Sequence, residues 1–85
     1  MSIWNTEENS LNATLIFADF SQAFAFMTEV AFLAEKHNHH PNWRNVWNTV
    51  EISLNTHDAG HIVTDKDRRL AADIEKIYAR YAPTR

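Results

Sequence analysis

The chain has no cysteine, one glycine and two prolines among its 85 residues. Without cysteine it can form neither a disulfide nor a thiolate metal site. With so few turn residues, its helices and strands must be read from hydrophobic periodicity. No segment approaches the ~20 consecutive apolar residues of a membrane span, and residues 1–10 are polar and acidic, unlike a secretory signal peptide. We therefore expect one domain over residues 1–85, located in the cytoplasm and not bound to a membrane.

The charge balance is slightly acidic, with a formal net charge of −3 at pH 7. This argues against direct nucleic-acid binding, which requires a basic surface. A domain of this size buries only ~60–65% of the surface that its unfolded chain exposes, so association would help to stabilise it. A free sheet edge favours the same outcome, and we expect a homo-oligomer, either a dimer or a tetramer. Histidine is unusually frequent, and four of the five histidines lie between His37 and His57.

The first half of the chain predicts a strand followed by a helix. Alternating apolar side chains over residues 11–17 indicate a half-buried strand. Asp19 can cap the next helix, with Gln22 as its reciprocal partner. Apolar residues then recur at helical spacing to about Lys36. A short additional strand is expected around Trp4.

The second half predicts a long strand, a loop and a second helix. The alternation of residues 46–55 indicates one strand with a single buried face. A loop around Gly60 follows. Thr64 and Asp67 then form a capping box for an amphipathic helix that ends before Pro83.

This order of elements favours an α+β fold in which two helices pack on one face of a small antiparallel sheet. A parallel sheet is disfavoured because the strand segments alternate rather than being apolar throughout. In such a fold, clefts open where strands and helices end.

Three histidines stand at such ends. His39 and His40 follow the first predicted helix, and His57 follows the long strand. Histidine can hold or release a proton near physiological pH, so imidazoles in different environments could divide the proton delivery and proton removal that a dehydration requires. Trp43 could offer a surface on which a flat ring stacks. These residues suggest acid–base catalysis.

Structural explanations compete with this hypothesis. A loop histidine is more often a solvated or hydrogen-bonded surface residue than a catalyst. Asp67 is explained by its place in the capping box, where a carboxylate accepts hydrogen bonds from backbone N–H groups. A metal site formed by His37, His39 and His61 is a further alternative. It is disfavoured because the i, i+4 helical spacing of zinc enzymes is absent and no cysteine is present.

Longer segments of the sequence resemble the pterin-4a-carbinolamine dehydratase family. The most specific signal is a His-His-Pro-x-Trp segment followed, at the family's distance, by a Thr-His pair. The similarity covers about residues 11–78, most of the chain. The matching segments are Phe17–Phe20, Ala23–Met27, Glu35–Trp43, Asn45–Leu54, Thr56–Gly60 and Thr64–Asp67.

The resemblance implies a fold and a reaction. The fold is a four-stranded antiparallel sheet with helices on one face, again α+β. The reaction is the loss of water from 4a-hydroxytetrahydropterin, the spent cofactor of aromatic amino acid hydroxylases, to give quinonoid dihydropterin during tetrahydrobiopterin recycling. The enzyme would be a lyase without metal or cofactor, with the pterin as substrate and a hydroxylase as a pathway partner.

The family's catalytic residues match positions of this sequence. Its three histidines match His39, His40 and His57, and its supporting carboxylate matches Asp67, which would orient His57. We expect His57 and His40 to form the principal acid–base pair, with His39 binding or assisting. Which of them is the acid and which the base stays open.

The resemblance also implies a substrate-binding set. Trp43 matches the aromatic residue beside the family's pocket. Asn55 and Thr56 occupy the stretch whose backbone meets the pterin.

The sequence departs from the family pattern in three places. The N-terminal family helix ahead of the position of Trp4 is expected to be missing, because only three residues precede it here. Asn38 stands where an acidic residue is common. The loop after His57 is one residue longer than the compact form, and His61 and Ile62 fill it.

A protein-interaction module on the same fold is the alternative function. Some members of the family bind a transcription factor through a helix surface. In this chain, Phe24 and Phe32 widen the apolar face of the first helix and could form an adhesive surface.

Overall fold

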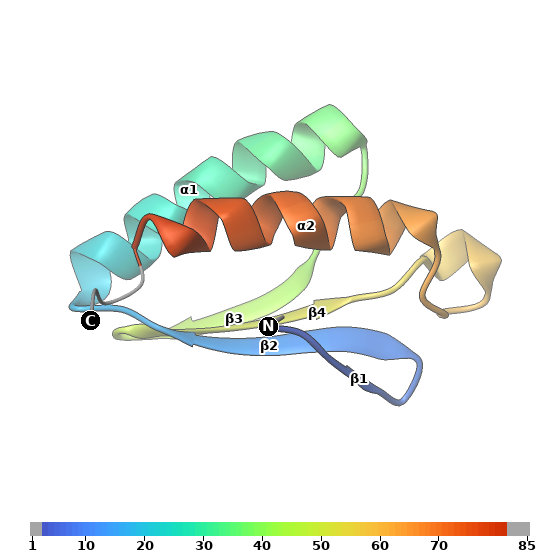
Figure 1. Cartoon of the computed structure of the whole chain (residues 1–85), viewed down its shortest axis with the longest axis horizontal. Helices are drawn as coiled ribbons and strands as arrows, with labels where there is room; N and C mark the ends of the chain where they lie inside the picture. The colour runs from blue at the N-terminus through green and yellow to red at the C-terminus, as the bar shows by residue number, and fades with distance from the viewer. Residues whose placement is uncertain (1–2, 82–85) are drawn as a thin grey trace.

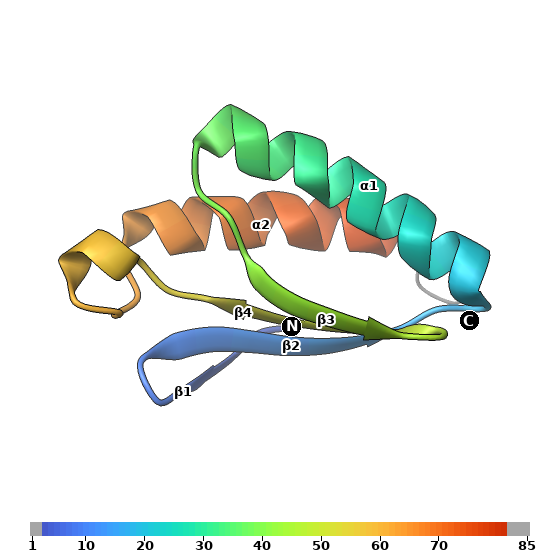
Figure 2. The same ribbon diagram turned by 180° about the vertical axis from the view of Figure 1, so that it is seen from behind.

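The computed structural model of the chain describes residues 3–81 and has the predicted α+β architecture (Figure 1). A four-stranded sheet has the spatial order β1-β2-β4-β3, and every neighbouring pair is antiparallel. Both helices cover the same face of this sheet, which leaves the other face open (Figures 1 and 2). In chain order the elements are β1 Asn5–Glu7, β2 Ser10–Ile16, α1 Phe20–His37, β3 Asn42–Val46, β4 Thr49–Leu54, a 3-10 turn His57–Ala59, and α2 Asp65–Ala79.

The core lies between the sheet and the two helices. Strand alternation turns every second residue of β2 and β4 towards the helices, and the register sets Ala13 opposite Ile52 and Leu15 opposite Val50. Each helix contributes one apolar stripe to the same layer. The buried residues are Leu11, Ala13, Leu15 and Phe17 around β2, Val50, Ile52 and Leu54 in β4, Ala23, Phe26, Val30 and Ala34 in α1, and Leu70, Ala71 and Ile74 in α2.

The prediction of one long strand over residues 46–55 is wrong, because the chain reverses within it. β3 ends at Val46 and β4 begins at Thr49, and the two strands form a hairpin. Trp47 adopts a left-handed backbone with φ of 49° and is largely exposed. The Asn45 side chain donates hydrogen bonds to the carbonyls of Trp47 and Thr49 at 3.1 and 2.9 Å, which stabilises the turn without a glycine.

Both helices begin at the predicted cap residues, although within residues 3–81 the Gln22 side chain makes no reciprocal hydrogen bond to Asp19. The Asp19 side chain accepts a hydrogen bond from the backbone N–H of Gln22 at 2.8 Å at the start of α1. Thr64 and Asp67 form the predicted capping box at the start of α2. The short strand predicted near Trp4 is β1, which is the first element within residues 3–81.

The end of α1 turns the chain back towards the sheet. Its C-cap residue, Asn38, has a left-handed backbone with φ of 52°, a conformation that asparagine tolerates better than most residues. The next N–H, that of His39, donates to the carbonyl of Ala34 at 3.0 Å. This reversal brings the histidine pair back over the end of β4. Neither helix is long and apolar enough to cross a membrane within the part of the chain that is described.

Candidate active site

A pocket of about 260 Å³ lies where the end of α1, the end of β4 and the start of α2 meet. It brings together the three histidines that the sequence singled out, although they come from two distant segments. His39 and His40 come from the chain just after α1, and His57 comes from the 3-10 turn after β4. The full lining consists of Asn38, His39, His40, Asn55, Thr56, His57, Asp58 and Lys66.

A buried carboxylate anchors one wall of the pocket. Asp67 is fully buried in the first turn of α2. Its Oδ1 lies 2.5 Å from Nε2 of His39, whose side chain is only 10% exposed. Its Oδ2 accepts hydrogen bonds from the Thr56 hydroxyl at 2.7 Å and from the Thr64 backbone N–H at 2.8 Å. One side chain therefore joins the ends of α1, β4 and the following loop to α2.

The carboxyl group of Asp67 is held in its charged form. Burial by itself would raise its pKa, but the hydrogen bonds from His39, Thr56 and the Thr64 N–H together outweigh that penalty and lower the pKa below its ordinary value. An ionised carboxylate can only accept hydrogen bonds. In this contact Nε2 of His39 is therefore the donor and the carboxylate the acceptor.

The partner predicted for Asp67 was His57, and the structure corrects this to His39. Both carboxylate oxygens are occupied by His39, Thr56 and the backbone of Thr64. His57 begins the 3-10 turn beyond the end of β4 and is exposed. The histidine that lies next to α2 in space is thus the one that follows α1.

His40 has a carboxylate partner of its own that the sequence reading missed. Its Nε2 lies 2.7 Å from Oε2 of Glu35 in the last turns of α1. Both side chains are open to solvent, at 57% and 77% exposure. A carboxylate one helical turn before a histidine pair is the signal that could have revealed this contact. Lys66, which the sequence did not single out, also lines the pocket.

Two of the three predicted substrate-binding residues line this pocket. Thr56 is buried and shares its hydroxyl with Asp67 and with Thr64, at 2.5 Å from the latter's hydroxyl oxygen. Asn55 directs its side-chain amide to the hydroxyl of Ser10 at 3.1 Å. Its side chain therefore ties the end of β4 to β2.

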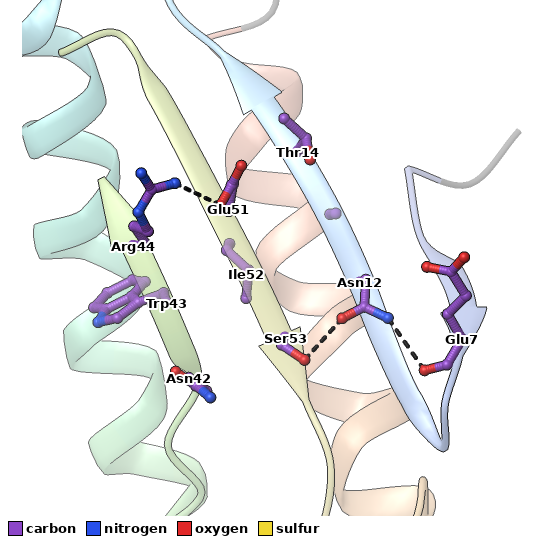
Figure 3. Close-up of a pocket in the computed structure, with 10 residues that line it drawn as sticks. Glu7, Asn12, Thr14, Asn42, Trp43, Arg44, Glu51, Ile52 and Ser53 are labelled. Atoms are coloured by element: carbon purple, nitrogen blue, oxygen red, sulfur yellow. Dashed lines mark hydrogen bonds and ion pairs between the residues drawn. The ribbon is translucent and has the colours of Figure 1, made fainter. Parts of the chain in front are cut away.

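The third, Trp43, lies elsewhere. It pairs with Ile52 across the β3–β4 ladder, and its side chain packs, partly buried, against the core on the helix side of the sheet. The residue also borders a separate hollow of about 370 Å³ that residues of β1, β2, β3 and β4 form (Figure 3). Around that hollow, Arg44 pairs with Glu51 at 3.1 Å. A stacking role of Trp43 towards a ligand stays a prediction.

The three histidines of the metal-site alternative are not gathered. His37 pairs with Asp73 of α2 at 2.8 Å, His39 contacts Asp67, and His61 lies against His57 in the loop. Across residues 3–81, no group of three or more histidine, cysteine or acidic side chains is placed to hold a metal ion.

Fold and site together define a small α+β domain with a pocket built from three imidazoles and a buried carboxylate. The model of the family described as pterin 4 alpha carbinolamine dehydratase matches residues 1–77. The chain belongs to this family.

Comparisons with individual relatives support the same family. Proteins named "Putative pterin-4-alpha-carbinolamine dehydratase" from Prochlorococcus marinus (strain MIT 9312) and Rhodopseudomonas palustris (strain BisB18) are each 49% identical, over 88% and 94% of this chain and 77% and 80% of their own lengths. The structure of a transcriptional coactivator/pterin dehydratase from Brucella melitensis matches with a TM-score of 0.84 at 36% identity, over 88% of this chain and 81% of that one. The fold is also shared by a pterin dehydratase-like protein described as a RuBisCO assembly factor in the alpha-carboxysome. That structure matches with a TM-score of 0.72 at 24% identity, over 91% of this chain and 89% of that one.

Proposed function

We propose that this chain dehydrates 4a-hydroxytetrahydropterin to quinonoid dihydropterin and water by histidine acid–base catalysis. The observation that carries the proposal is the convergence of His39, His40 and His57 on one pocket in a member of this family. The buried contact between His39 and Asp67 gives the pocket a fixed wall, against which a flat bicyclic ring can be oriented.

The three histidines differ in solvent exposure and in their partners, and these differences suit them to different roles. The His39 side chain is 10% exposed and held by Asp67, so it suits binding and orientation. The side chain of His40 is 57% exposed and His57 is also exposed, so both can exchange protons with water after each turnover. These two are the acid–base pair of the proposal.

The reaction balances with two imidazoles and nothing else. A neutral imidazole takes the proton from N5, and the electrons of that N–H bond form the N5=C4a double bond. The C4a–O bond breaks, and the departing hydroxyl takes a proton from an imidazolium and leaves as water. One imidazole gains the proton that the other loses, and exchange with solvent restores both. No oxidant, reductant or metal enters the balance.

The test is the rate of dehydration of 4a-hydroxytetrahydropterin generated during the turnover of an aromatic amino acid hydroxylase. Its ultraviolet absorbance should decay faster with the purified protein than in buffer, in proportion to protein concentration. A decay equal to the buffer control at every protein concentration would contradict the proposal.

A protein-interaction role is the second candidate, and an exposed aromatic surface on α1 favours it. Phe20 and Phe24 lie with their ring centroids 5.6 Å apart and are about half exposed, and Phe32 is 73% exposed. Exposed apolar side chains that line one helix are typical of a contact surface. A second copy of the chain is the proposed partner, consistent with the homo-oligomer expected from the small size of the domain.

Light scattering tests this association. The wild-type protein should have a mass that is a multiple of 9.9 kDa, and the double variant Phe24→Glu/Phe32→Glu should shift towards the monomer because charge would be buried at the contact. The variant Lys76→Glu, at an exposed position of α2, serves as the control and should not shift. A wild-type protein that is strictly monomeric at high concentration would rule this association out.

A further inference from the structure

The loop that carries His57 is closed by backbone hydrogen bonds. The N–H of Thr56 donates to the carbonyl of Ile62 at 2.8 Å, and the N–H of His61 donates to the carbonyl of Thr56 at 3.0 Å. The N–H of Gly60 also donates to the carbonyl of His57 at 3.1 Å. The backbone of residue 61 is therefore fixed relative to that of His57, only four residues earlier.

His61 holds a conformation that favours glycine. Gly60 has φ of +90°, and His61 follows it with φ of +61°. A residue with a side chain is uncommon in this left-handed region, and such residues gather at functional sites, where the surrounding structure holds them.

The His61 ring lies against the ring of His57. Their centroids are 4.3 Å apart and their planes meet at 84°, an edge-to-face arrangement. Aromatic rings favour this geometry because the positive edge of one meets the negative face of the other. His61 is not among the residues that line the pocket, so it reaches the pocket only through His57.

The other two pocket histidines are oriented by carboxylates, Asp67 for His39 and Glu35 for His40. Within residues 3–81, the ring of His57 makes no hydrogen bond or ion pair of that kind. The side-chain contact that its ring does make is with the ring of His61.

We infer that His61 is a positioning residue that holds the imidazole of His57 in its catalytic orientation by edge-to-face contact. This inference rests on the proposed dehydratase function. An exposed imidazole turns readily about its terminal side-chain bond, so its nitrogens face the pocket only part of the time. A ring packed across it limits that rotation without taking a hydrogen bond from the imidazole. Positioning of this kind affects the reacting geometry more than substrate affinity.

Two variants distinguish the effect of the His61 ring from that of the backbone conformation at residue 61. His61→Asn removes the ring but keeps a residue that tolerates the left-handed conformation, and His61→Phe keeps a ring that has no titratable nitrogen. We expect His61→Asn to lower kcat about three- to tenfold with little change in KM, and His61→Phe to retain most of the wild-type kcat. The midpoint of urea unfolding, which should be unchanged in His61→Asn, checks that the loop still folds.

A second readout does not depend on activity. In nuclear magnetic resonance spectra, the ring protons of His57 should shift in His61→Asn because the ring current of residue 61 is lost, while those of His39 stay in place. An unchanged His57 spectrum would overturn the inference whether or not the wild type is an active dehydratase. A wild type without dehydratase activity would by itself refute only the proposed reaction. With an active wild type, a normal kcat in His61→Asn, or a loss in His61→Phe as large as in His61→Asn, would also overturn it.

Discussion

Replacing His57 by alanine is expected to lower the kcat of pterin dehydration about 100-fold or more, the loss typical of a missing general acid or base. His57 is the pocket histidine that no carboxylate of the described chain engages, and it lines the same pocket as His39 and His40. KM should change much less than kcat, because the remaining pocket walls still bind the ring. The measurement is the steady-state rate of dehydration over a range of substrate concentrations.

His37→Ala is the matched control for this experiment. His37 pairs with Asp73 between the two helices and does not line the pocket. Its loss should cost some stability but leave kcat within about twofold of the wild type. If His37→Ala and His57→Ala lowered the rate equally, the proposed division of roles would be wrong.

Replacing Asp67 by alanine is expected to lower the free energy of unfolding by about 2–4 kcal/mol, because it leaves buried donors without an acceptor. His39, Thr56 and the backbone of Thr64 all direct hydrogen bonds to this carboxylate. The catalytic rate should fall as well, since the wall that holds His39 is lost. Urea unfolding and the dehydration assay measure the two effects on the same sample.

The dependence of this loss on pH has a defined sign. The pKa of Asp67 is lowered in the folded protein, so the stability that the charged carboxylate contributes is present above its unfolded pKa of ~3.9 and disappears as pH falls through the folded pKa. The difference in unfolding free energy between wild type and Asp67→Ala should therefore be constant near neutral pH and shrink below about pH 4. Asp73→Asn, at a partly exposed carboxylate, is the comparison. A difference for Asp67→Ala that grew as the pH fell would contradict the assignment.

The parts of the fold that the sequence predicted are those fixed by local signals. The caps at Asp19 and at Thr64 with Asp67 depend on side chains within a few residues of the backbone groups they satisfy. The alternation in β2 and the helical spacing in α1 and α2 follow from one buried face each. The hairpin at Trp47 was missed because a left-handed tryptophan, stabilised by the Asn45 side chain, gives no glycine or proline signal.

The three pocket histidines were predictable from the sequence, but their partners were not. The family pattern pointed to His39, His40 and His57, and all three line one pocket. Which of them would contact Asp67 depends on how closely the end of α1 approaches the start of α2, and this is set by packing of the whole helix pair. His39 and Asp67 are 28 residues apart in the sequence, and no spacing pattern predicts that they are in contact.

The contact of His61 with His57 was hidden for a similar reason. The sequence showed only a loop longer by one residue than its family form, with a histidine in it. The edge-to-face geometry arises because Gly60 and His61 both adopt left-handed conformations and the loop closes on Thr56. Two histidines four residues apart outside a helix carry no signal that their rings will meet.

The central claim is that imidazoles from two distant segments of the chain act on one pterin, and a crystal structure with a bound dihydropterin tests it most directly. The account predicts that the bicyclic ring lies between His57 and the pair His39 and His40, with its bridgehead C4a next to His40 or His57 and the contact between His39 and Asp67 intact. A pterin seated elsewhere, such as the hollow on the open face of the sheet beside Trp43 (Figure 3), with the histidine pocket empty, would contradict it.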